Sequence, residues 1–234
     1  MTAAFNTSEA IHYGFARFGE ETAYCFTLFA GVEIFCLVSS AVLAYQAALV
    51  GQLVMQYDTM PPDAMVYPFI PIYFFIRTSA QVFVNKALLM LHDGHKITLD
   101  EVLGFDWAYH FPTVVRMVGA SIVYSAWSFV LSLALVLPGV FASSNLRFFK
   151  FVVVDHEVPA IEGLRESYEI GGTSKSELVS LNVLSSVMRL VGLLCLGIGF
   201  IPVSAICGLA EAYAYKRLVQ AYEFQQQHAA PQPS

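Results

Sequence analysis

The chain has 234 residues, of which 57% are hydrophobic and only 13% are charged, and its mean hydropathy is +0.61. So little polar surface cannot cover a water-soluble globule of this size, which excludes that class and favours a membrane protein. The net charge of −6 comes without any basic cluster, which also excludes nucleic acid as a partner.

Residues 1–22 are expected to form an amphipathic helix at the membrane surface. Ser8 is a suitable N-cap, and Ile11, Phe15 and Phe18 fall on one helical face. The mixed charges of this segment differ from the basic start of a signal peptide, so we expect the first hydrophobic segment to remain as an anchor.

Six hydrophobic segments are expected to cross the bilayer between residues 23 and 222, since about 20 apolar residues in a helix span the hydrocarbon core. They are Ala23–Val50, Val66–Leu91, Phe111–Leu137, Gly139–Val154, Leu178–Phe200 and Ile201–Val219. The fourth is short, and its Arg147 and Lys150 are expected to reach the inner headgroups by snorkelling.

The distribution of Lys and Arg sets the number and direction of these crossings. With six spans and the N-terminus inside, the outer connections, Gly51–Met65, Pro138–Gly139 and Gly199–Pro202, contain no Lys or Arg. If the fourth segment failed to cross, Arg165 and Lys175 would lie outside. The sequence therefore predicts an all-α polytopic protein of three helical hairpins in a prokaryotic cytoplasmic (inner) membrane, with both termini in the cytoplasm.

A second interfacial helix is expected at about 158–171. Pro159 lies in its first turn, Gly171 and Gly172 end it, and Ser174 with Glu177 forms a capping box for the next span. A further short helix is expected after Thr98, and the tail 223–234, rich in Gln, Pro and Ala, is expected to be disordered. The candidate docking residues on or beside the second interfacial helix are Asp155, Pro159, Ile161, Glu162, Leu164, Arg165, Ser167 and Tyr168.

The two interfacial helices share a residue pattern. Segments 9–19 and 162–172 both carry an acid, a small residue, an aliphatic residue, a small residue, an aromatic residue and a glycine at identical spacing. Each precedes an inside-to-outside span, which predicts an internal repeat of one interfacial helix and one hairpin. A middle unit, Ile97–Val154, fits by layout but not by residues, and chance similarity between amphipathic helices is the alternative.

Several motifs resemble one family of membrane proteins. They are Leu137-Pro138-Gly139, the aromatic and aliphatic run Phe148–Asp155, Pro159–Ser167, Leu196–Gly199 and Ala212–Leu218. The chain resembles the uncharacterised prokaryotic membrane proteins of the YciC type and is similar to the membrane domain of some glycerophosphoryl diester phosphodiesterases. The resemblance implies a membrane scaffold. It does not imply the phosphodiesterase activity, because the chain has no room for the soluble metal-binding barrel that this reaction needs.

Charged side chains inside the hydrocarbon are costly, so they are the first candidates for a functional site. Arg189 and Glu211 lie at equal depth in one hairpin, either as a structural ion pair or as a polar site for a headgroup or a proton. Glu33 and Arg77 face each other less well, and Arg116 is expected to anchor headgroups.

The segment His92-Asp93-Gly94-His95 carries potential metal ligands. A tetrahedral site would need a fourth ligand from His110 or His156, so we expect a solvated loop and neither a metal nor another cofactor. The four cysteines lie in apolar runs and are expected to be buried, and no catalytic motif is present.

The expected function is that of a non-catalytic scaffold or accessory subunit that binds membrane lipids, another membrane protein or a second copy of itself. A small-solute transporter or channel lined by the intramembrane Arg and Glu residues is the alternative. A lipid-headgroup enzyme is a second alternative, and it would need acids and histidines gathered near His92, Asp155 and His156.

Overall fold

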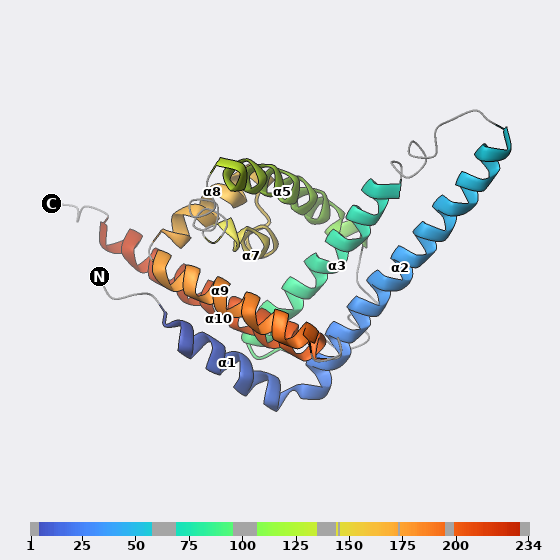
Figure 1. Cartoon of the computed structure of the whole chain (residues 1–234). Helices are drawn as coiled ribbons and strands as arrows, with labels where there is room; N and C mark the ends of the chain where they lie inside the picture. Colours follow the sequence, from blue (N-terminus) through green and yellow to red (C-terminus); the bar gives the residue numbers. More distant parts are fainter. Residues whose placement is uncertain are drawn as a thin grey trace.

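The computed structural model describes residues 5–57, 69–95, 107–134, 144, 146–172, 174–194 and 199–229. This part of the chain is entirely helical, with eight α-helices and no strand, as the composition predicts (Figure 1). The expected helix after Thr98 and the Pro138–Gly139 turn lie outside the described residues.

The helices follow the predicted segments closely in five of six cases. They are α1 (Thr7–Glu20), α2 (Thr22–Tyr57), α3 (Phe69–His92), α5 (Trp107–Ala134), α7 (Phe149–Asp155), α8 (Ala160–Gly171), α9 (Lys175–Leu194) and α10 (Phe200–Ala229). The exception is the fourth segment, where a turn at Arg147 and Phe148 precedes the seven-residue α7. The described part of that segment is therefore not one continuous spanning helix.

Two helix ends differ from the predictions. Asn6, not Ser8, is the N-cap of α1, because its side chain accepts a hydrogen bond of 2.8 Å from the backbone N–H of Ser8. At the other end, α10 continues to Ala229, so residues 223–229 of the expected disordered tail are helical. Gln, Ala and Phe continue a helix easily, and the first helix-breaking residue of the tail is Pro231.

The second helices of the three predicted units form the inner part of the molecule. Helix α3 packs on both α7 and α10, while the flanking helices α2, α5 and α9 pack outside them (Figure 1). Rings of Phe148 and Phe151 also stack on Tyr215 of α10, at centroid distances of 6.3 and 5.5 Å. The inner helices therefore come from three separate stretches of sequence.

The interfacial helices link neighbouring units. Helix α8 packs on α7 of the unit before it, and α1 packs along α10 of the last unit. When Glu9 is aligned with Glu162, the small residues Ala10, Gly14, Gly163 and Ser167 are all buried, whereas Phe15 and Tyr168 are 51% and 53% exposed. This matching burial supports the predicted repeat. The contacts of α8 and α1 with the neighbouring units place the three units around a common centre.

Large apolar side chains are exposed over the outer helices. Ile34 and Leu37 on α2 are 61% and 71% exposed, and Leu190 and Leu194 on α9 are 58% and 75% exposed. Two of the described helical segments, Thr22–Gln46 and Lys175–Leu194, are long and apolar enough to cross a membrane, and only 11% and 22% of their most apolar windows are buried. An outward-facing apolar surface of this extent suits contact with lipid.

Candidate functional site

One buried carboxylate lies at the centre of the molecule with three cations around it. Glu211 of α10 is 1% exposed. Arg147 Nη2 and Arg189 Nη2 lie 2.5 and 2.8 Å from its Oε1, and Lys150 Nζ lies 2.6 Å from its Oε2. Both carboxylate oxygens are thus held by charged donors, the condition under which a buried charge is tolerated.

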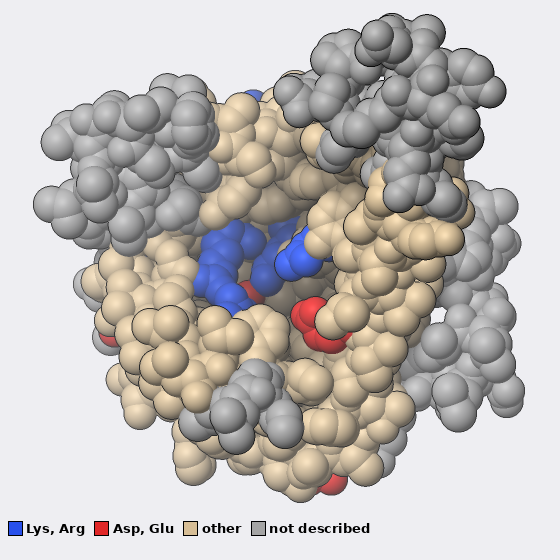
Figure 2. Space-filling model, turned by 45° about the vertical axis from the view of Figure 1, so that its right-hand side comes forward, with Lys and Arg blue, Asp and Glu red and all other residues tan. Residues whose placement is uncertain are grey.

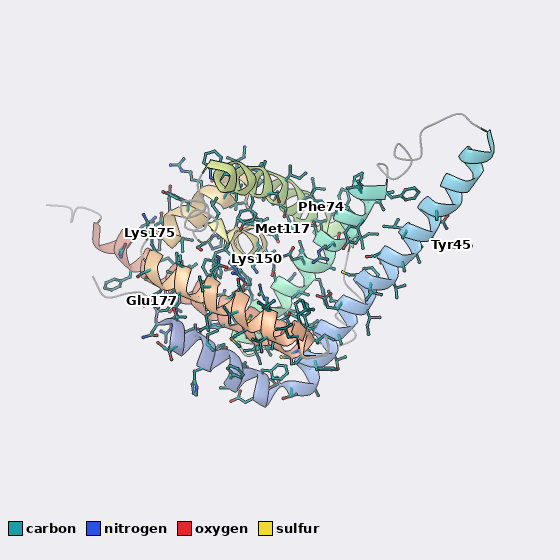
Figure 3. The ribbon with its side chains drawn as sticks, viewed as in Figure 1. Tyr45, Phe74, Met117, Lys150, Lys175 and Glu177 are labelled. Carbon is teal, nitrogen blue, oxygen red and sulfur yellow. The ribbon has the colours of Figure 1, made fainter. Side chains whose placement is uncertain are left out.

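Two of these cations arrive from the segment before and within α7. The expectation that Arg147 and Lys150 snorkel to the inner headgroups is wrong, because both side chains point inward to Glu211. The turn at Arg147 and Phe148 and the short α7 place both cations against α10. In Figure 3, Lys150 lies in the middle of the helices rather than at an end of the molecule.

Helix α9 supplies Arg189, the third donor to Glu211, and Asn182, an acceptor for Arg147. Arg189 lies opposite Glu211 across the α9–α10 hairpin, as the equal depth of the two residues predicts. About two turns earlier on α9, the side-chain oxygen of Asn182 accepts a hydrogen bond from Arg147, and its amide nitrogen donates to Ser144 Oγ at 2.9 Å. The Asn182 contacts fix the Arg147 side chain in its inward position.

A cavity with two lobes adjoins the Glu211 cluster. The carboxylate lobe has a volume of about 260 Å³, and its charged lining residues are Glu33, Arg77, Lys150, Arg189 and Glu211. The hydroxyl lobe has a volume of about 270 Å³ and is lined by Arg77, Arg147 and Lys150 with Thr78, Ser121, Tyr124 and Ser125. Arg77, Gln81 and Lys150 belong to both lobes, so the two are adjacent.

Glu33 and Arg77 line the same cavity without meeting. Arg77 Nη1 donates to Tyr73 Oη at 3.1 Å, and among the described residues no ion pair involves either Arg77 or Glu33. Glu33 and Arg77 therefore share one cavity without forming an ion pair with each other.

The cavity carries an excess of positive charge. Four cations, Arg77, Arg147, Lys150 and Arg189, and two carboxylates, Glu33 and Glu211, line its two lobes, which gives a formal net charge of +2. Figure 2 shows these colours together in one hollow, with Lys and Arg side chains on its walls and acidic side chains beside them. A hollow of this sign attracts anions, and weak screening inside the protein strengthens the attraction.

The groups that a headgroup enzyme would need lie together where α3 and α7 end beside the middle of α10. Lys216 Nζ is 3.3 Å from Asp155 Oδ2 and 3.7 Å from Asp93 Oδ2, and His92 Nδ1 is 3.1 Å from Asp93 Oδ1. His156 Nδ1 pairs with Glu166 at 2.7 Å. Lys216 forms ion pairs with both aspartates, and the described residues contain no group of His, Cys, Asp or Glu arranged to hold a metal.

Some of the predicted docking residues on α8 are buried in the core, and others are exposed at the surface. Leu164 is 8% exposed and Ser167 is fully buried, whereas Ile161 is 75% exposed and Tyr168 is 53% exposed. Pro159 is the N-cap rather than a first-turn residue, because α8 begins at Ala160. Glu162 lines a groove of about 690 Å³ between α8 and the end of α10.

That groove also holds Arg165, which pairs with Glu169 at 3.0 Å. Hydrogen bonds from Tyr222 and Arg165 hold the pKa of the Glu169 carboxyl below its usual value.

Two further predicted roles differ in the structure. Glu177 has a partner outside the expected capping box. Its carboxylate accepts hydrogen bonds from Thr7 N and Thr7 Oγ1 of α1, at 2.9 and 2.6 Å. Arg116 donates to the backbone oxygen of Glu157 and so ties α5 to the segment before α8. Both contacts hold an interfacial helix in place.

The sequence contains a signal for the missed partners of Glu211. Arg147 and Lys150 are three residues apart, so they share one helical face within a hydrophobic segment. The only acidic residues inside the predicted spans are Glu33 and Glu211. The counter-charge of Arg147 and Lys150 could therefore have been narrowed to Glu33 or Glu211 from the sequence alone.

No family model, curated protein or solved structure matches the chain. The resemblance to the YciC-type proteins therefore stays a prediction, and the functional argument depends on the site itself.

Proposed function

We propose that this protein is a non-catalytic scaffold of the prokaryotic cytoplasmic membrane that binds the anionic headgroup of a phospholipid in the two-lobed cavity. The observation that carries the proposal is the net charge of +2 on the cavity walls. An excess of charge away from bulk water is costly, and an entering phosphate lowers that cost. Arginine suits this ligand, because its planar N–H groups match the oxygens of a phosphate.

The proposal includes six membrane crossings with both termini inside. The exposed apolar faces of α2 and α9 support contact with lipid. The fourth segment crosses in this arrangement as a broken helix, with its turn at Arg147 beside the cavity and Phe148 only 2% exposed. Irregular backbone at membrane depth is tolerated where it is buried in protein or lines a polar cavity.

A lipid can present its headgroup to this cavity from the bilayer. The hollow is open at the molecular surface (Figure 2), and the helices around it carry exposed apolar residues such as Ile34 on α2 and Val187 on α9. Acyl chains would lie against these faces while the headgroup enters between them. Each lobe is smaller than the roughly 300–1,000 Å³ of pockets that hold whole drug-sized ligands, which suits a headgroup.

Extraction of the protein with its surrounding lipid tests the proposal. The full chain is isolated in native-membrane nanodiscs, stripped of bulk lipid by exchange into detergent, and analysed by mass spectrometry for retained phospholipid. We expect retained phospholipid in the wild type and at least about a tenfold loss in Arg77→Gln, because a hydrogen bond to a charged group is worth ~1.5–3 kcal/mol.

Lys175→Gln is the matched control. Lys175 is exposed at the start of α9 and lines none of the described cavities, so its loss removes one positive charge without changing the two-lobed cavity. Equal lipid retention by the wild type and Arg77→Gln, or no retained lipid in the wild type, would overturn the proposal.

Transport of a small anion is the second candidate, and the unpaired state of Arg77 and Glu33 favours it. A transporter needs charged groups that a solute can reach, and both residues line the open hollow. Proteoliposomes loaded with radioactive phosphate give the test. Release that depends on the protein and is lost in Arg77→Gln supports transport, whereas tight retention with lipid binding intact excludes it.

A further inference from the structure

One acid of the cavity lining has no counter-charge among the described residues. Glu33 on α2 lines the carboxylate lobe, and it is the one carboxylate of the cavity that has no ion pair with a described residue. Glu211, by contrast, is fully occupied by Arg147, Lys150 and Arg189. Glu33 is therefore the acid that remains available to a ligand.

The charged side chains that line the hydroxyl lobe are all cations. Its lining contains Arg77, Arg147 and Lys150 but no acid, and it adds the hydroxyl groups of Ser121, Tyr124 and Ser125 from α5. Cations with hydroxyl donors form the usual environment of a phosphate in proteins. A phosphate in this lobe would lie beside Arg77, which also borders the carboxylate lobe.

An unsatisfied polar group lines the carboxylate lobe. Asn85 on α3 is 2% exposed and lines the carboxylate lobe, and its side-chain amide nitrogen has no hydrogen-bond partner among the described residues. A buried donor left without an acceptor costs free energy, so such groups in native proteins call for a partner. A ligand that extends across both lobes supplies one if an oxygen of its phosphate ester lies near Asn85.

From these three observations we infer that the ligand is a zwitterion, with a phosphate ester in the hydroxyl lobe and a primary ammonium at Glu33. The chemistry is that of phosphoethanolamine, either as the headgroup of an aminophospholipid or as a free soluble molecule. The inference rests on the proposed function, since it names the headgroup that the cavity selects. An anionic headgroup without an ammonium satisfies Arg77 but leaves Glu33 unpaired.

Competition between lipids tests the inference. The purified full chain is placed in nanodiscs containing equal amounts of phosphatidylethanolamine and phosphatidylglycerol, and the retained lipids are quantified by mass spectrometry after detergent exchange. We expect the wild type to prefer phosphatidylethanolamine by about tenfold or more, the ratio that one charge-assisted hydrogen bond provides. Glu33→Gln is expected to lose this preference and to retain phosphatidylglycerol at least as well as the wild type.

The variants separate the two proposals. If Arg77→Gln retains both lipids as the wild type does, the proposed function fails. If Arg77→Gln loses both lipids but Glu33→Gln keeps the wild-type preference, only the zwitterion inference fails. Arg77→Lys, which retains the charge, is expected to keep much of the binding, and helical circular dichroism with a single size-exclusion peak verifies that each variant is folded.

Soluble phosphoethanolamine distinguishes the two sources of the ligand. Its addition at millimolar concentration displaces the retained phosphatidylethanolamine if the cavity accepts the free zwitterion. No displacement means that the acyl chains contribute and that the ligand is the lipid. Displacement by inorganic phosphate alone, with no stronger effect of phosphoethanolamine, would contradict a role for Glu33.

Discussion

Glu211 shows how one buried acid can organise several helices. Its carboxylate contacts Arg147 and Lys150 from the α7 segment and Arg189 from α9, residues that lie 64, 61 and 22 positions away in the chain. Desolvating three cations and a carboxylate is expensive, so the cluster adds little net stability compared with an apolar core. Its importance lies in the cost of breaking it, because any cation left alone would be buried without a counter-charge.

Replacing Glu211 by Gln therefore strongly destabilises the protein. The change leaves three cations around a neutral amide, and removing one partner of a buried ion pair costs ~3–5 kcal/mol. The free energy of unfolding of the purified protein in detergent, measured by chemical denaturation with tryptophan fluorescence, is expected to fall by about that amount. Glu162→Gln is the control, since Glu162 is exposed on α8. A loss below ~1 kcal/mol in Glu211→Gln would contradict the central role of this carboxylate.

At the scale of elements, small residues decide which helices approach closely. A Cβ on Gly14 of α1 would lie 2.5 Å from the backbone oxygen of Ile206, so α1 touches α10 there with no space for a side chain. A Cβ on Gly163 of α8 would lie 2.6 Å from Val153 Cγ2 of α7. The two related helices thus use a small residue to pack against the inner helix of a neighbouring unit.

Gly14→Val is expected to displace α1 from α10. Backbone atoms cannot yield as a flexible side chain can, and overpacking of this kind typically costs ~1–3 kcal/mol. The free energy of unfolding should fall by that amount, and α1 should become more sensitive to protease. Gly19→Ala is the matched control, because a Cβ there has no neighbour within 4 Å and alanine favours the helix. Equal stability of the two variants would show that the α1–α10 contact is unimportant.

At the scale of the whole molecule, the units are arranged as a ring around the cavity. Helix α1 of the first unit packs on α10 of the last, which joins the start of the chain to its end. The hydrogen bonds of Thr7 with Glu177 and the stacking of Tyr13 on Tyr213, with centroids 4.6 Å apart, strengthen this junction. The cavity is therefore built from all three units and cannot form from any one of them.

The proposed membrane topology makes a prediction at this scale. Fusions after Glu157 and after Ser234 are expected to give a cytoplasmic signal with a fluorescent reporter and none with alkaline phosphatase. A fusion after Pro61, in the predicted outer connection, is expected to give the reverse. The reason is the absence of Lys and Arg from the outer connections. An external signal after Glu157 would show that the fourth segment does not cross.

Local patterns in the sequence determine most of the helices. Long apolar stretches predicted the positions of α2, α3, α5, α9 and α10, because hydrophobic length and helix propensity are properties of neighbouring residues. The end of α8 at Gly171 was predicted for the same reason, since two consecutive glycines favour the end of a helix. The Arg189–Glu211 pair also followed from sequence, because a hairpin relates the depths of its two helices.

Tertiary structure alone decided the site. Arg147 and Lys150 carry the same charge whether they face headgroups or Glu211, so their sequence does not reveal their direction. Packing of α7 on α3 and stacking of Phe151 on Tyr215 of α10 turn both cations inward. Arg77 and Glu33 are left on the lining of one cavity without an ion pair to a described residue. Whether a charged side chain can bind a ligand depends on whether a neighbour in the fold already pairs with it, and the sequence does not contain that information.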